Sequence, residues 1–307
     1  MKYDKPGILK IIGILILLWI VSVAVSMVLS PGDDKPTSGN VVVIPIKGII
    51  LGDKDGAGFL SDVAESTSIV EDIEKAGKNE KIKAVVFEIN TPGGSAVASD
   101  EVGQAIKRLN KTTVSYIREV GASGGYWIAS STDRIFVNRM TITGSIGVIA
   151  SYLQFSGFLA DNNITYERMV GGKFKDLGSP FKKMSDAERA IFQKSLDAIH
   201  EEFIKEVALN RGLEVDEVRR LATGQIFLGR EALELGLVDE IGGKEEVKQY
   251  LETALGEEVK LFEYEDKESF LDLLSEIMSG QSFSVGQGIG SALLSKQATR
   301  SFPEIWS

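Results

Sequence analysis

Three glycine-rich turns contain the residues whose types and spacing could support catalysis. The first, Asn90–Ser95, places Gly93 and Gly94 between an apolar run and a helical pattern. Paired glycines let the backbone turn sharply and direct amide N–H groups to one point, as an oxyanion hole requires. A tight strand-to-helix turn without a catalytic role explains the same residues equally simply.

The second turn, Gly121–Trp127, contains Ser123 between small residues at the start of an expected helix. Small neighbours expose a serine Oγ to substrate, and a helix N-terminus stabilises developing negative charge, so one interpretation is a nucleophile. The alternative is that Ser123 is a helix N-cap. For Tyr126 and Trp127, the alternatives are a hydrophobic substrate groove and the core.

The third turn, Gly171–Pro180, is rich in lysine and includes Lys173 and Lys175. An ordinary lysine has a pKa of about 10.4, so a lysine can be a general base only where desolvation lowers that value, by as much as about 3–5 units. A nearby carboxylate would oppose this change, so Asp176 must point away from such a base. The alternative is a solvated basic loop.

Composition excludes several competing chemistries. The 307 residues contain no Cys and one His, His200, so a cysteine nucleophile, a disulfide and a zinc site built on several histidines are impossible. A Ser-His-Asp triad would have to use His200, which we expect on the exposed surface of a charged helix. A net charge of -10 argues against nucleic acid as a partner.

Short β-branched runs alternate with longer helical patterns, which indicates an α/β fold with largely parallel strands. Expected strands are Val41–Ile44, Ala84–Ile89, Thr113–Ile117, Arg134–Val137 and Ile146–Ala150. Expected helices are Ser61–Lys78, Ala96–Leu109, Leu153–Asn162, Ser185–Asn210, Lys244–Leu255 and Ser269–Met278. Pro45 either ends the first strand or marks it as an edge strand.

An uncharged apolar run, Ile11–Leu29, is long enough to span about 28 Å as a helix, close to the thickness of a bilayer core. Lysines precede it and two aspartates follow, so the positive-inside rule predicts a cytoplasmic N-terminus and an extracytoplasmic remainder. The alternative is a signal peptide cleaved near Ala24–Ser26.

Together, the order and spacing of these motifs resemble the signal peptide peptidase SppA family of Ser-Lys serine proteases. The resemblance covers roughly Val41 to Glu257. It is carried by Gly93-Gly94, Ala122–Tyr126, Thr143–Gly147, Lys175-Asp176 and a later block with Gly224, Ala232 and Gly236–Asp239. It implies a Clp protease/crotonase-like α/β fold, and an N-terminal transmembrane helix as in the half-length members of the family.

The resemblance also implies a role for each candidate site residue. The matches are Ser123 as nucleophile, Lys175 as general base, Gly94 and Gly124 as oxyanion-hole donors, Gly93 as the next candidate donor, and Ser145 as a hydroxyl that helps hold the lysine. In the half-length members the subunits form a ring-like dome, and the dyad is completed across the subunit boundary. We therefore expect a homo-oligomer here.

The function implied is a membrane-anchored serine endopeptidase that degrades hydrophobic peptides, such as signal peptides left after cleavage from secreted proteins. No cofactor or metal is expected. The implied organisation is an N-terminus and anchor over residues 1–30, a linker over 31–40, a protease domain over 41–265 and a C-terminal helix and tail over 266–307. Three alternatives remain: a Clp-type Ser-His-Asp peptidase using His200, a crotonase-type acyl-CoA enzyme, and a non-catalytic membrane scaffold.

Overall fold

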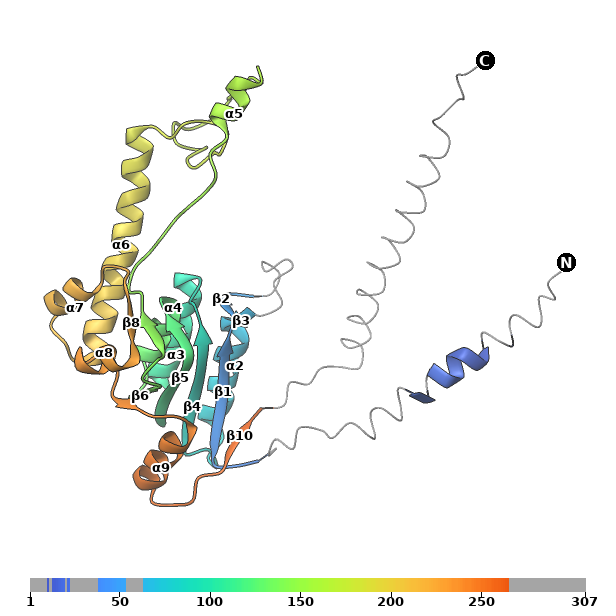
Figure 1. Cartoon of the computed structure of the whole chain (residues 1–307), viewed down its shortest axis with the longest axis vertical. Helices are drawn as coiled ribbons and strands as arrows, with labels where there is room; N and C mark the ends of the chain where they lie inside the picture. The colour runs from blue at the N-terminus through green and yellow to red at the C-terminus, as the bar shows by residue number, and fades with distance from the viewer. Residues whose placement is uncertain (1–9, 11–12, 20, 23–37, 54–62, 265–307) are drawn as a thin grey trace, which may run out of the picture. The chain divides into compact units, whose positions relative to one another are not determined.

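The computed structural model describes residues 10, 13–19, 21–22, 38–53 and 63–264 (Figure 1). Within these residues the chain is a mixed α/β protein built on an eight-stranded sheet, as the sequence predicts. The main strand order is β10-β1-β4-β5-β6-β9, and all of these neighbours pair in parallel. Their bounds are Leu261–Glu263 (β10), Val41–Lys47 (β1), Ala84–Thr91 (β4), Thr112–Ala122 (β5), Arg134–Val137 (β6) and Glu240–Ile241 (β9).

Two further strands extend the sheet beside the end of β5. Strand β7 (Ile142–Gly144) runs parallel to β5, and β8 (Ile226–Leu228) runs antiparallel to β7. A separate two-stranded sheet joins β2 (Ile49–Leu51) to β3 (Val63–Glu65). The carboxyl ends of β4, β5 and β7 therefore lie next to one another, which is where open α/β sheets place their ligands.

Helices cover both faces of the sheet. On one face, buried apolar side chains of α2 (Ser66–Lys78), α3 (Ala96–Arg108), α4 (Gly124–Ser130) and the second half of α6 (Asp186–Arg211) form the larger core cluster. On the other, α9 (Lys244–Leu255) buries Val247 and Leu251 against β1, β4, β5 and β6. Strand β4 is buried almost throughout because its apolar side chains meet helices on both faces. The short helices α7 (Val215–Leu221) and α8 (Gly229–Glu234) complete the described fold.

Several expected boundaries need correction. The strand expected over Ile146–Ala150 is wrong: β7 ends at Gly144, because Gly144 and Ser145 both have positive φ, and the following residues have no regular structure. The helix expected over Leu153–Asn162 is shorter, α5 being Ser156–Asp161. Strand β1 continues through Pro45. Its pairing with β10 covers only Val41–Val43, so the edge of β1 at Pro45 is not paired with β10. A proline, which has no amide N–H to donate, is tolerated at such an edge.

Residues 149–199, which we call the arm, lie largely outside the packed core. Helix α5 has no buried residue, and it lies beyond the N-terminal end of α6 in Figure 1. Apart from Glu188, the buried residues of α6 all lie in its second half. Several large apolar side chains of the arm are exposed, among them Ile149, Leu153, Phe158 and Met169.

The predicted membrane anchor, Ile11–Leu29, lies mostly outside the described residues, as does most of the predicted linker. Within the part of the chain that the structure describes, no helix is both long and apolar enough to cross a membrane. The helix predicted over Ser269–Met278 and the tail after it lie outside the described residues as well.

Candidate active site

Ser123 lies between the end of β5 and the first turn of α4, in a backbone conformation that is rare for a residue with a side chain. Its φ is 52° and its ψ is -120°, and its side chain makes no capping hydrogen bond. Ser123 therefore occupies the N-cap position of α4, as one interpretation of the sequence had it, but its side chain does not cap the helix. Such a conformation costs about 1–3 kcal/mol, and strained residues of this kind cluster at functional sites.

Ser145 lies beside Ser123 because the two strands that precede them are paired. The register of β5 and β7 places Ala122 opposite Gly144, and the Ser123 amide donates to the Gly144 carbonyl at 2.9 Å. Ser145 has a φ of 51°, and its amide donates to the Gln225 carbonyl at 2.8 Å. The sheet thus presents two serines from neighbouring strand ends.

The turn after β4 brings the predicted oxyanion-hole glycines to the same place. The buried Thr91 holds this turn, since its Oγ1 accepts from the Gly93 amide at 3.0 Å. A Cβ on Gly124 would lie 3.3 Å from the Gly94 nitrogen, and a Cβ on Gly93 would lie 2.7 Å from the Gly124 nitrogen. The amides of Gly94 and Gly124 are therefore close together. Neither has a hydrogen-bond acceptor among the described residues, so both can donate to an oxyanion.

A cavity of about 820 Å³ is lined by Ser123, Ser145 and the two glycines Gly94 and Gly124. Its walls also include Trp127, Leu196 and Phe203, and the rings of Trp127 and Phe203 lie 4.7 Å apart. No lysine, arginine, aspartate or glutamate is among the described residues that line it. The cavity is therefore suited to an apolar peptide segment.

His200 also lines this cavity, a position not expected from the sequence. We expected an exposed histidine, but the side chain is half-buried, and its Nε2 is buried without a hydrogen-bond partner among the described residues. One signal in the sequence was available for this position. One face of α6 lines the cavity, and its members have helical spacing: Leu196, Ile199, His200 and Phe203. Among the described contacts, no carboxylate orients the imidazole: Asp197 accepts from Gln193, and Glu201 pairs with Arg219.

The two aromatic residues of the second turn have different roles. Tyr126 is fully buried, its hydroxyl donates to the Leu237 carbonyl at 2.7 Å, and burial raises the pKa of this phenol. It is a core residue. Trp127 forms part of the cavity wall. Trp127 is itself buried and belongs to the core as well, so the core interpretation holds for both residues, and a role of Trp127 in a substrate groove stays a prediction.

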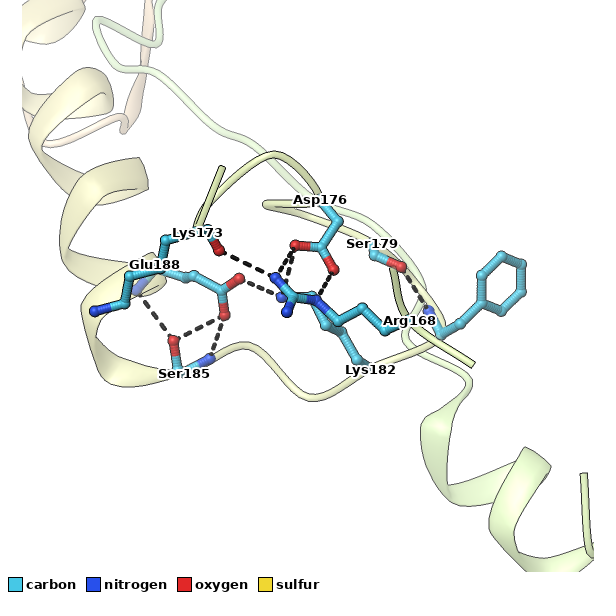
Figure 2. Close-up of polar contacts among 8 residues, drawn as sticks. Arg168, Lys173, Asp176, Ser179, Lys182, Ser185 and Glu188 are labelled. Carbon is cyan, nitrogen blue, oxygen red and sulfur yellow. Dashed lines mark hydrogen bonds and ion pairs between the residues drawn. The ribbon is translucent and has the colours of Figure 1, made fainter. Parts of the chain in front are cut away.

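The structure does not bring Lys175 to Ser123 within one copy of the chain. Lys175 lies in an exposed turn of the arm and is not among the residues that line the cavity. Its neighbour Asp176 has other partners, because its carboxylate accepts two hydrogen bonds from Arg168 and lies 3.5 Å from the Lys182 Nζ (Figure 2). Arg168 holds the pKa of Asp176 well below its usual range. Asp176 is thus engaged elsewhere, as a Ser-Lys dyad requires.

A strained serine at a strand-to-helix turn, beside two amides without an acceptor among the described residues and in the wall of a cavity, is typical of the serine hydrolase class. Residues 105–258 match peptidase family S49. The chain belongs to this family of serine-type peptidases, and within it to the SppA group.

Two relatives illustrate the membership. A protein of Enterococcus faecium, named as a candidate signal peptide peptidase SppA, is 30% identical over 76% of this chain and 77% of its own length. Protease 4 of Haemophilus influenzae is 34% identical over 66% of this chain and 32% of its own. Among solved structures, a point mutant of ClpP1 from Listeria monocytogenes superposes with a TM-score of 0.45 at 15% identity, covering 66% of this chain and 92% of that one.

Proposed function

We propose that the protein is a membrane-anchored serine endopeptidase that degrades hydrophobic peptides, such as remnant signal peptides, with Ser123 as nucleophile and Lys175 as general base. The observation that carries the proposal is the strained Ser123 beside the amides of Gly94 and Gly124, which have no acceptor among the described residues. A serine held this way by a core or capping role would have no reason to keep the strain, which also disfavours a non-catalytic scaffold.

The proposed reaction is a two-step acyl transfer. The Ser123 Oγ attacks the peptide carbonyl while the Lys175 amine takes its proton, and the Gly94 and Gly124 amides stabilise the oxyanion. The ammonium then protonates the departing amine, leaving an acyl-enzyme. The lysine, neutral again, activates the water that releases the acid and frees Ser123.

The base must reach the cavity from elsewhere, because no lysine lines it within the described part of one copy. We propose that a second copy of the chain supplies Lys175. The arm that carries Lys175 supports this, since it exposes large apolar side chains such as Leu153, Phe158 and Met169, a pattern typical of a protein interface. Burial in such an interface would also supply the desolvation that a neutral lysine needs.

The proposed substrate class rests on the cavity and on the sequence. Aromatic and aliphatic walls without a charged group favour an apolar peptide, and signal peptides have an apolar central region. We also propose that Ile11–Leu29 anchors the protein in the membrane, with the protease domain on the extracytoplasmic side. An anchored domain would work close to where such peptides accumulate.

A second candidate mechanism has an observation of its own. His200 lines the same cavity as Ser123, so a Ser-His pair could replace the Ser-Lys dyad. Against it, no carboxylate among the described residues hydrogen-bonds to the imidazole, which would leave its orientation and tautomer unfixed.

Cleavage of a labelled signal-peptide-like substrate by the full chain in detergent micelles tests the proposal. We expect Ser123→Ala to remove activity and Lys175→Ala to lower it by about 10²–10⁴-fold, the usual contribution of a general base. Lys173→Ala is the matched control, two residues away in the same turn, and His200→Ala should also remain active. Full activity in Lys175→Ala with loss in His200→Ala would replace the dyad by a Ser-His pair.

A further inference from the structure

A network of ion pairs encloses the turn that carries Lys175. Arg168 donates to both carboxylate oxygens of Asp176, at 2.5 and 2.8 Å, and to the Lys173 carbonyl at 3.0 Å (Figure 2). Lys182 bridges Asp176 and Glu188. The turn is thus tied to the segment before it and to the segment after it.

The network also ties the turn to the first turn of α6. Glu188 accepts from the Ser185 amide at 2.9 Å and from its hydroxyl at 2.8 Å, while the Ser185 Oγ caps the helix. Lys182 and these Ser185 bonds lower the pKa of Glu188 to about 2, so the carboxylate stays charged at neutral pH. Lys182, on its other side, contacts Asp176. The position of Lys175 is therefore linked to the longest helix of the described fold.

The two carboxylates of this network are more shielded than their surroundings. The side chains of Asp176 and Glu188 are 12% and 6% exposed, although most of the arm around them is exposed. A shielded, multiply bonded carboxylate is held in one geometry, whereas exposed ion pairs contribute little. We propose that Asp176 is a positioning residue for the general base, because it fixes the turn that carries Lys175. Its cationic partners Arg168 and Lys182 offset the negative charge of its carboxylate, which would otherwise favour the protonated form of the lysine. This inference rests on the proposed role of Lys175.

The charges of the network make the proposal testable, because removing an anion and removing a cation should shift the pKa of the base in opposite directions. Arg168 and Lys182 are two cations, Asp176 and Glu188 are two anions, and together they are neutral. The other groups that face the network are the Tyr166 ring and the Lys173 backbone, and the Lys173 ammonium lies over the Phe174 ring. Removing an anion therefore disfavours the protonated form of the nearby base, and removing a cation favours it.

The experiment is the pH profile of kcat/KM for the full chain in micelles, with the labelled hydrophobic peptide. Activity falls on the acidic limb of the profile, where the base becomes protonated. Asp176→Asn should move this limb to lower pH and Arg168→Gln should move it to higher pH, each by about 0.3–1 unit. Both should also lower the plateau, because the turn loosens. Arg168→Lys keeps the charge but loses the two-fold contact, so its limb should stay in place while its plateau falls.

Two controls separate the possible failures. Arg219→Gln removes the ion pair between Arg219 of α7 and Glu201 of α6, outside the network, and should leave the limb unmoved. Repeating the series in a His200→Gln background excludes the imidazole as the titrating group. If Lys175→Ala abolishes cleavage but the limb does not move in opposite directions, the positioning role is wrong and the dyad stands. If Lys175→Ala stays active, the proposed function itself fails.

Discussion

Two of the three non-glycine residues with positive φ in the described chain, Ser123 and Ser145, lie side by side at the candidate active site. Both follow the ends of paired parallel strands, so the sheet itself imposes their proximity. The small residues around them permit this packing, since the Gly93 backbone approaches Ser123 so closely that a Cβ there would lie 2.9 Å from the Ser123 Cβ. The geometry of the nucleophile thus depends on the turns that follow β4, β5 and β7.

Gly93 should therefore tolerate no side chain. Its φ is 104°, and an added Cβ would lie 2.7 Å from the Gly124 nitrogen, a candidate oxyanion donor. We expect Gly93→Ala to lower the free energy of unfolding by about 1–3 kcal/mol and to remove peptidase activity, as measured by denaturant titration and peptide cleavage.

Gly52→Ala is the matched control. No atom of the described residues lies within 4 Å of a Cβ added to Gly52, and Gly52 is not among the residues that line the cavity, so stability and activity should be retained. A fully active Gly93→Ala protein would show that the turn does not need this close approach.

At the residue scale, the sequence predicted the turns that form the site but not their full membership. The glycine pairs and the small neighbours of Ser123 are local signals, and the structure brings Ser123, Gly93, Gly94, Gly124 and Ser145 together. The strain at Ser123 could not be predicted, because it depends on contacts between elements far apart in the sequence. The helical spacing of His200 indicated a shared helix face, but not which part of the fold that face meets. The role of Lys175 stays a prediction.

At the scale of elements, α6 performs two tasks. Its second half packs in the core through Phe203, Ile204 and Val207, while its first turn anchors the network around Lys175. Ser185 contributes to the second task, because its side chain both caps the helix and donates a hydrogen bond to Glu188 of the network.

Ser185→Ala should weaken the start of α6 without unfolding the core. Loss of an N-cap costs about 0.5–2 kcal/mol, and here the loss falls on the exposed half of the helix. We expect faster hydrogen exchange over residues 185–192 and unchanged exchange over 203–211, read by mass spectrometry. Equal acceleration in both halves would mean that the helix unfolds as one unit and that the cap has no local effect.

The elements themselves were largely predictable where the pattern was strong. Lys244–Leu255 matches α9 residue for residue, because its apolar positions have a clear helical period and glycines flank it. Short strands such as β2, β3, β9 and β10 were missed, since two or three residues carry no period. The strand predicted over Ile146–Ala150 was wrong, because an apolar run predicts a buried strand, whereas Ile149 is 89% exposed.

At the scale of the whole molecule, the nucleophile and the proposed base belong to different surroundings. Ser123 lies in the packed body and Lys175 in the arm, whose exposed apolar side chains suggest a partner surface. If a second copy covers that surface, one contact both desolvates the lysine and completes the active site. Activity would then depend on assembly, which would confine proteolysis to the assembled protein.

Mixing two inactive variants tests this account most directly. Full chains carrying Ser123→Ala or Lys175→Ala, each with its own affinity tag, are co-expressed and purified through both tags. We predict that the mixed assembly regains about a quarter of wild-type activity at equal incorporation, because a serine from one variant meets a lysine from the other at random. A mixture of Ser123→Ala with the double variant should remain inactive. No activity in the mixed assembly above that of each variant alone would contradict a dyad completed between copies of the chain.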